Sequence, residues 1–314
     1  MARRSFALHV KEELCHNSYE SLEVKKALLS AYIRINGVVV IRNKHSILTL
    51  SNENAKTIKF IYSLILDIYP SNVSISFQKK GNTKTTYTIV VSNNVEDILD
   101  ELKVNYLEGK ISKDIVYSDE TISGYLAGAF LACGSINSPE TSNYHLELAV
   151  NSENYAKWLS HLFLRYKNNK IEPRIIERRN KYVLYFKKGD QIADFLVMIG
   201  AMSSAMDFEN YRIDRDYMNN ANRLTNLDTA NMSKTVEAGK RQAHEIKYLI
   251  KHIGLENIGN KKTQLVASIR VDYISKPLEE IASMVSKELN EEVTKSNINH
   301  IFRRIHELYL KEKK

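Results

Sequence analysis

An internal repeat organises roughly the first two hundred residues of the chain. Residues 27–39 align without a gap with residues 124–136, so that small residues and glycines recur 97 positions apart. Further on, residues 47–54 (ILTLSNEN) parallel residues 147–154 (ELAVNSEN), now 100 positions apart because the second copy has a longer loop around Pro139. A repeat of this length predicts two similar α+β halves related by a pseudo-twofold axis.

Each copy has the same order of predicted elements: a helix, a hairpin, a second helix, a strand or hairpin, and a third helix. Apolar side chains at intervals of three and four residues indicate the helices, and short apolar runs indicate the strands. Beyond the aligned segments, the copies continue with helices at 56–67 and 156–166, strands at 86–91 and 182–186, and helices at 95–102 and 191–199. We therefore place the repeats at about 20–105 and 117–200.

The first helix of each copy carries two small residues one turn apart on the same face. They are Ala27 and Ala31 in the first copy and Gly124 and Gly128 in the second. Because small side chains let two backbones approach closely, we expect these helices to pack together at the centre of the domain. Gly37 and Gly134 follow the helices, and we expect each to end its helix in the left-handed conformation.

The segment Leu126–Gly134 (LAGAFLACG) resembles the LAGLIDADG motif of homing endonucleases. In that family the eighth motif position of each copy is an acid, and the two acids hold divalent metal for phosphodiester hydrolysis. Here the two positions are Asn36 and Cys133. A neutral carboxamide and a mostly protonated thiol do not supply the anionic oxygen ligands that magnesium requires. We therefore predict no nuclease activity, and neither a metal nor another cofactor.

Basic side chains gather on or beside the predicted strands of the repeat. They are Lys79, Lys80, Lys84, Arg174, Arg178, Arg179 and Lys181. In these places they could reach the phosphates of a nucleic acid. A solvated hairpin face explains them as well, because basic turns are common and no aromatic residues are interleaved with these.

After Met202 the sequence becomes more polar. Residues 216–231 are rich in asparagine and residues 234–252 have a helical pattern, which indicates a linker helix. Its polar stripe could face DNA or water, and consists of Asn219, Asn222, Arg223, Asn226, Asn231 and Lys234. We divide the chain into a duplicated domain at 1–205, a linker and helix at 206–255, and a C-terminal domain at 256–314.

Three further helices are predicted in this C-terminal domain. The first covers Thr263–Tyr273, the second opens at Pro277, and Thr294 or Ser296 caps the third. Residues 275–294 carry two cations and five acids, whereas residues 295–314 carry six cations and two acids. The last helix is therefore the basic one, and residues 275–308 indicate a helix-turn-helix.

The outward positions of this last helix combine cations with hydrogen-bonding side chains. They are Lys295, Ser296, Asn297, Asn299, His300, Arg303 and Arg304. Such a mixture can hydrogen-bond to base edges in a major groove and hold the flanking phosphates, so we assign these seven residues as candidate DNA-binding residues. A solvated helix end is the alternative interpretation.

Short segments along nearly the whole chain resemble the WhiA family. They are Phe6 with Val10–Leu14, then Asn222-Arg223, Asn226, Ala230-Asn231, Lys234-Thr235 and Gln242, then Leu278–Ala282, and finally Lys295–His300 with Arg303-Arg304. The resemblance implies a degenerate LAGLIDADG domain joined to a helix-turn-helix, in a DNA-binding regulator of Gram-positive bacteria and their relatives. It also implies a role in cell division and chromosome segregation, with sporulation control in sporulating relatives. Pro277 and the longer turn at 290–294 depart from a tight helix-turn-helix.

Charge and cysteine content agree with a DNA-binding protein of the cytoplasm. The formal net charge of +8 and the pI of about 9.1 favour a polyanionic partner. Cys15 and Cys133 are the only cysteines, which fits a reducing compartment, and neither a signal peptide nor a membrane-spanning run is apparent.

We therefore predict a non-enzymatic transcriptional regulator that binds double-stranded DNA, associates with the nucleoid and has other transcription or division proteins as candidate partners. Two alternatives remain open at this point. One is an RNA- or protein-docking module. The other is a residual homing endonuclease, which would need a neighbouring acid such as Glu147 in place of the missing ones.

Overall fold

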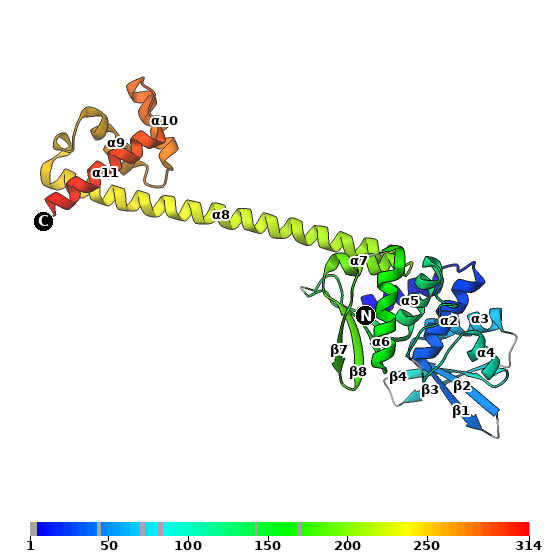
Figure 1. The fold of residues 1–314 in the computed structure, drawn as a ribbon. Coiled ribbons are helices and arrows are strands. Elements are labelled where there is room, and N and C mark those ends of the chain that lie inside the picture. Colours follow the sequence, from blue (N-terminus) through cyan, green and yellow to red (C-terminus); the bar gives the residue numbers. More distant parts are fainter. Residues whose placement is uncertain are drawn as a thin grey trace. The chain divides into compact units, whose positions relative to one another are not determined.

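The computed structural model of the chain describes residues 5–42, 45–69, 73–80, 84–107, 109–141, 143–168 and 171–313. It separates into two units, residues 1–215 and residues 216–314, and each is considered by itself (Figure 1). The boundary falls within one long helix, α8 (Met202–Ile253). Among the helices that the structure describes, none is both long and apolar enough to cross a bilayer.

The first unit contains the two copies of the repeat, preceded by α1 (Phe6–His16). The first copy comprises α2 (Leu22–Asn36), β1 (Gly37–Arg42), β2 (His45–Asn52), α3 (Ala55–Ile68), β3 (Val73–Lys80), β4 (Lys84–Val91) and α4 (Val95–Glu101). The second comprises α5 (Asp119–Cys133), β5 (Gly134–Ile136), β6 (Leu146–Val150), α6 (Glu153–Arg165), the short 3-10 helix η1 (Tyr166–Asn168), β7 (Arg174–Arg178), β8 (Lys181–Phe186) and α7 (Gly189–Met198). The strands form two antiparallel sheets of order β1-β2-β4-β3 and β5-β6-β8-β7, so equivalent strands take equivalent places. The predicted duplicated α+β domain is confirmed.

Helices α2 and α5 pack against each other through their small residues. A Cβ atom added at Gly128 would lie 2.1 Å from the carbonyl oxygen of Leu28, and one added at Gly124 would lie 2.8 Å from a backbone oxygen of α2. Ala27 and Ala31 on the facing helix are fully buried. The close approach that the spacing predicts is present, because no side chain separates the two backbones at these points.

The prediction that Gly37 and Gly134 end their helices in the left-handed conformation is wrong. Their φ angles are −75° and −70°, and both lead in extended conformation directly into a strand. Both positions are glycine because a side chain would clash there. A Cβ atom added at Gly37 would lie 2.4 Å from the carbonyl oxygen of Ile33, and one added at Gly134 would lie 2.2 Å from the ring of Phe130. The sharp change from helix to strand brings the backbone against the preceding turn.

Each sheet has one face against helices and one open face. In the first sheet Leu48 and Leu50 of β2 are buried, so Thr49 between them lies on the open face. In the second sheet Leu146 and Leu148 of β6 are buried, which places the intervening Glu147 on the open face. The core of the first unit therefore lies between the sheets and the helices.

One continuous helix, α8, occupies the polar stretch after Met202. Glu13 of α1 stabilises its start, because this carboxylate accepts hydrogen bonds from the backbone N–H groups of Ser203 (2.7 Å) and Ser204 (2.9 Å). Farther along, Thr225 and Thr229 donate to carbonyl oxygens four residues earlier, at 3.0 Å and 2.8 Å. Neither proline nor glycine interrupts residues 202–238. The asparagine-rich composition therefore does not break the helix.

The second unit consists of the remainder of α8, the short 3-10 helix η2 (Leu255–Asn257), α9 (Lys261–Asp272), α10 (Leu278–Leu289) and α11 (Lys295–Glu312). Pro277 precedes α10 as its cap residue instead of opening it, one position from the expected start. The buried core gathers one or more apolar side chains from each of α8, α9, α10 and α11: Ile246, Leu249, Val266, Ile281, Val285, Ile298, Phe302 and Ile305. The all-α C-terminal unit agrees with the predicted fold class.

Candidate nucleic-acid interface

The turn between α10 and α11 is fixed by local hydrogen bonds. Asn290 ends α10 with a left-handed φ of 51°, and the hydroxyl of Ser286 accepts a hydrogen bond from the Val293 N–H at 2.9 Å. Thr294 then caps α11, since its hydroxyl accepts from the Asn297 N–H while the Asn297 side chain accepts from the Thr294 N–H, both at 3.3 Å. Of the two candidate caps, Thr294 is therefore the one used. The five-residue turn is longer than a tight one but well ordered by these contacts.

Helix α11 separates an apolar from a polar face. Ile298, Phe302 and Ile305 are buried in the core, as the sequence predicts, and Tyr309 joins them. Every one of the seven candidate DNA-binding positions is exposed: Lys295, Ser296, Asn297, Asn299, His300, Arg303 and Arg304. Apolar contacts thus hold the helix from behind while its polar side chains remain accessible to a partner.

Two of these seven side chains already have partners within the unit. The ammonium of Lys295 lies 2.9 Å from a carboxylate oxygen of Glu279 on α10, and Asn297 takes part in the cap of α11. In the described part of the chain, no hydrogen bond or ion pair engages the other five side chains. Arg303 and Arg304 therefore keep their full hydrogen-bonding capacity, which in a guanidinium suits bidentate contacts to a phosphate or a guanine.

A groove of about 330 Å³ runs beside α11 and extends the polar surface onto α9. Its walls combine His300 and Arg304 of α11 with Asn260, Lys262 and Thr263 at the start of α9. We did not predict these last three residues from the sequence. The adjacent lysines at 261 and 262 were the available signal, but only the packing of α9 beside α11 brings them to the same surface.

Arg270 is a buried cation that sequence reasoning missed. Its side chain is only 1% exposed, and one guanidinium nitrogen donates to the carbonyl oxygens of Tyr273 (3.2 Å), Ile274 (3.3 Å) and Lys276 (2.8 Å). The guanidinium carbon also lies 5.3 Å from the centre of the Phe302 ring. Arg270 therefore fixes the turn that leads from α9 into α10 and links it to α11.

The two degenerate motif positions lie at the ends of the central helices of the first unit. Asn36 donates a hydrogen bond to the carbonyl oxygen of Ala132 at 3.3 Å, and Cys133 donates to that of Ala129 at 3.4 Å. Burial raises the pKa of the Cys133 thiol to about 11, so the sulfur stays protonated near neutral pH. Among the described residues, no three His, Cys, Asp or Glu side chains gather in a way that could hold a metal ion.

Glu147, the neighbouring acid considered as a substitute for the missing ones, already has partners. Glu147 lies 2.9 Å from the guanidinium of Arg178 and 3.0 Å from the imidazole of His145. The Arg178 guanidinium reaches both oxygens of this carboxylate. Glu147 is thus part of a charge network on the open face of the second sheet.

The basic residues predicted near the strands do not form one surface. Strand register places Arg174, Arg178 and Lys181 on the open face of the second sheet, with Arg178 paired to Glu147. Lys79 has the opposite orientation, on the helix side of β3, and Arg179 lies in the turn between β7 and β8. The side chains of Lys80 and Lys84 lie outside the described residues.

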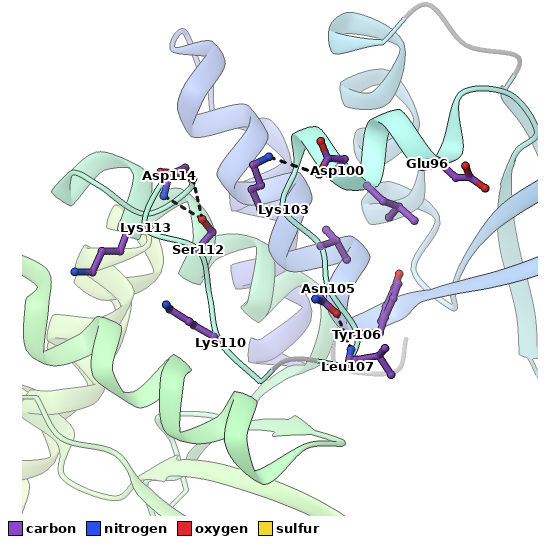
Figure 2. A pocket seen from close by; sticks show the side chains of 12 residues that line it. Glu96, Asp100, Lys103, Asn105, Tyr106, Leu107, Lys110, Ser112, Lys113 and Asp114 are labelled. Carbon is purple, nitrogen blue, oxygen red and sulfur yellow. Dashed lines mark hydrogen bonds and ion pairs between the residues drawn. The ribbon is translucent and has the colours of Figure 1, made fainter.

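A larger hollow of about 840 Å³ lies between α4 and the segment that joins the two copies (Figure 2). Its walls contain three lysines and three acids, and Lys103 lies 3.6 Å from a carboxylate oxygen of Asp100. Ser112 and Asp114 bond to each other at its other end. The mixed charge of this hollow favours neither an anion nor a cation.

Three family models match the chain in succession. They are described as the WhiA N-terminal LAGLIDADG-like domain at residues 22–105, the WhiA LAGLIDADG-like domain at residues 122–218, and the WhiA C-terminal HTH domain at residues 221–309. The matches follow the order of the two copies and the helical unit. The C-terminal model includes all seven exposed positions of α11.

Related sequences and solved structures agree with these matches to WhiA domains. A "Probable cell division protein WhiA" from Staphylococcus aureus strain USA300 is 38% identical over 309 residues, covering 97% of this chain and 96% of that protein. The protein of the same name from strain JH9 is 37% identical over the same length.

The crystal structure of full-length DUF199/WhiA from Thermatoga maritima matches with a TM-score of 0.62 and 24% identity, covering 98% of this chain and 99% of that one. The N-terminal LAGLIDADG domain of DUF199/WhiA matches with a TM-score of 0.52 and 25% identity, covering 63% of this chain and 91% of that one. Because the similarity in sequence and in fold spans nearly its full length, this chain belongs to the WhiA family.

Proposed function

We propose that this chain is a transcriptional regulator that binds double-stranded DNA through α11 and does not cut it. The observation that carries the proposal is the exposed polar face of α11. Five of its side chains have no partner among the described residues, and two of these are arginines one position apart. A helix held from behind by apolar contacts, with such a face outward, suits insertion into a major groove.

The chemistry at the ends of α2 and α5 supports binding without cleavage. Asn36 is neutral, burial keeps Cys133 protonated, and Glu147 is paired with Arg178. Hydrolysis of the LAGLIDADG kind needs negatively charged oxygen ligands for magnesium. We infer that the first unit has kept the architecture and lost the reaction.

The biological setting follows from the relatives. The proteins from Staphylococcus aureus are named as probable cell division proteins, and we propose the same process for this chain, together with chromosome segregation and association with the nucleoid. Other transcription or division proteins are the further partners that we propose. The domain organisation that we propose is a duplicated domain at 1–205, a connecting segment at 206–255 and a DNA-binding domain at 256–314.

Loss of the two arginines tests the proposed interface. Duplexes selected from a randomised pool by the full-length protein are titrated by fluorescence anisotropy at several salt concentrations. Arg303→Ala with Arg304→Ala should weaken binding by about 10-fold or more and lower the salt dependence by about one to two phosphate contacts. The matched control is Lys247→Ala with Lys251→Ala, which removes the same charge from exposed positions of α8 in the same unit. Equal affinity of the arginine variant and the native chain would rule out α11 as the recognition helix.

Cleavage is tested separately with pure protein. Supercoiled plasmid and the selected duplexes are incubated with magnesium or manganese, and products are resolved on gels. We expect no nicking above that of a heat-denatured sample. Metal-dependent cleavage that copurifies with the protein would contradict the proposal.

A second candidate function, protein docking by the first unit, is favoured by one observation. The open face of its first sheet presents mainly valine, threonine and serine, among them Val38, Val40, Thr49 and Ser51. Such a face has little to offer a phosphate backbone. Selection from the randomised pool separates the candidates, since a chain that only docks proteins should enrich no duplex. Competition with a structured RNA excludes RNA docking, since such an RNA should not displace the selected duplex if α11 reads DNA.

A further inference from the structure

The part of α8 that belongs to the second unit begins with a stripe of polar side chains. The stripe consists of Asn219, Asn222, Arg223, Asn226 and Lys234, all of them exposed. A regular helix turns by about 100° per residue, which gathers these five within about 120° of its circumference. Asn231, which the sequence pattern also placed in the stripe, lies about 140° from Asn226 and therefore on another side of α8.

The described part of the chain does not cover or engage this stripe. No hydrogen bond or ion pair of the described residues involves its five side chains. From Asp216 to Lys234 every residue except the partly buried Ala221 is exposed. The nearby hydroxyls of Thr225 and Thr229 bond to carbonyl oxygens of α8 itself. Packing within the chain therefore does not explain why asparagine and arginine stand at these positions.

Helix stability does not explain the asparagines either. Five of the six asparagines of α8 lie between residues 216 and 234. Asparagine forms helices less readily than alanine, lysine, glutamate or glutamine, because its side chain competes for backbone hydrogen bonds. A solvated helix is often supported by opposite charges four residues apart, and the sequence has no such pair within this stretch. The segment gives up helix stability for hydrogen-bonding groups, which indicates a partner.

The chemistry of the stripe matches double-stranded DNA. A carboxamide offers both a donor and an acceptor, the combination that pairs with the edge of adenine in a major groove. Arg223 and Lys234 add two positive charges, whereas Asp228, the one acid between residues 219 and 234, lies on the far side of the helix. The stripe is about 22 Å long, and a major groove is wide enough to admit a helix. Two cations without an acid favour a polyanion over a protein surface of mixed charge.

We propose that this stripe of α8 is a second DNA-contacting surface, in which Asn222 and Asn226 bond to base edges while Arg223 and Lys234 hold phosphates. The proposal extends the function proposed for α11 and rests on the same ligand, duplex DNA. The residues of the stripe are separate from the seven candidate positions of α11 and from the groove beside them. The contributions of the two surfaces can therefore be measured separately.

The experiment uses the full-length chain and the selected duplexes, extended by flanking sequence and titrated by fluorescence anisotropy. Asn222→Ala with Asn226→Ala should weaken binding by about 10-fold or more, because the hydrogen bonds of both carboxamides are lost. Alanine favours a helix more than asparagine does, so circular dichroism should show no loss of helix in this variant. Arg223→Gln should lower the salt dependence of binding by about one phosphate contact.

The matched control is Asn220→Ala with Asn231→Ala. It makes the same two changes at exposed positions of the same segment, but outside the stripe. Its affinity should stay within about twofold of that of the native chain. The proposal is overturned if Asn222→Ala with Asn226→Ala binds as tightly as the native chain, or if the control loses as much affinity.

The arginine variant of α11 separates failure of this proposal from failure of the proposed function. In the background of Arg303→Ala with Arg304→Ala, the changes at Asn222 and Asn226 should lower the remaining affinity by a further factor of about 10, since independent contacts add. Loss of affinity only on changing α8 would leave the stripe as a DNA contact and remove α11 as the recognition helix. Loss only on changing α11 would overturn the proposal for α8 and leave that for α11 in place.

Discussion

Replacing Gly128 by alanine tests the packing of α2 against α5, on which the first unit depends. The added Cβ would lie 2.1 Å from the carbonyl oxygen of Leu28, whereas ordinary contact begins at 3.4 Å. The two helices would therefore have to separate by on the order of 1 Å, and a gap of that size forfeits a quarter to a half of each van der Waals contact along the crossing. No side-chain rotation relieves this overlap, because the obstacle is backbone.

The sign of the effect distinguishes close packing from simple helix preference. Alanine stabilises a helix by about 1 kcal/mol relative to glycine, so Gly128→Ala would make the protein more stable if the site had room. Overpacking of an interior costs about 1–3 kcal/mol, and more where backbone must move. We expect the second effect to win, with a net loss of about 2 kcal/mol in the free energy of unfolding of the first unit.

The assay is urea unfolding followed by tryptophan fluorescence. Trp158 is the only tryptophan of the chain and lies on α6, so its signal reports on the first unit. With a denaturant dependence of about 2 kcal/mol per molar urea, the midpoint should fall by about 1 M. Gly124→Ala, with its nearest backbone atom at 2.8 Å, is the graded comparison and should lose less. An unchanged or higher midpoint for Gly128→Ala would refute the reasoning.

The further predictions concern three single side chains. Burial raises the pKa of Cys133 from an ordinary 9.0 to about 11, so at pH 8 iodoacetamide should label this thiol about 100-fold more slowly in the folded chain than in urea. Because the folded state keeps this proton where the unfolded state loses it, the stability that Cys133 contributes should fall as the pH rises from about 9 to about 11, as measured by unfolding at each pH. Thr294→Ala removes the cap of α11 and should destabilise the second unit by about 1 kcal/mol, seen by circular dichroism, whereas Thr294→Ser should not. Arg270→Leu leaves three carbonyl oxygens without their donor and should cost on the order of 3 kcal/mol in the same assay; a loss below that of Thr294→Ala would contradict the role assigned to Arg270.

Several parts of the structure could be predicted because they depend on neighbours in the sequence. The apolar stripe of α11 and its cap at Thr294 follow from spacing over a few residues. The repeat itself is visible because both copies must bury the same faces, which keeps Gly124 and Gly128 against the backbone of α2 at Val24 and Leu28. Exposure of the candidate residues on α11 follows from the same periodicity.

Other features depend on contacts between distant segments, which spacing does not reveal. Gly37 is glycine because Ile33 and Tyr106 crowd it, and the second of these is 69 positions away. The start of α9 joins the surface of α11 only because the helices pack side by side. The carboxylate that caps α8 comes from Glu13, far earlier in the chain.

The sequence alone therefore determined the order of elements in the two copies and in the C-terminal unit, that the fold is duplicated, that the acids of the motif are absent, and that the last helix is basic. Each of these is a local pattern or a comparison of two local patterns. Only the tertiary structure decided that Arg270 is buried between the helices of the second unit, and that the start of α9 shares a surface with α11. Whether a side chain is buried, and which distant segments lie beside it, depends on contacts between residues far apart in the sequence. The sequence position of a cation therefore does not show whether its side chain lies in the core or in water.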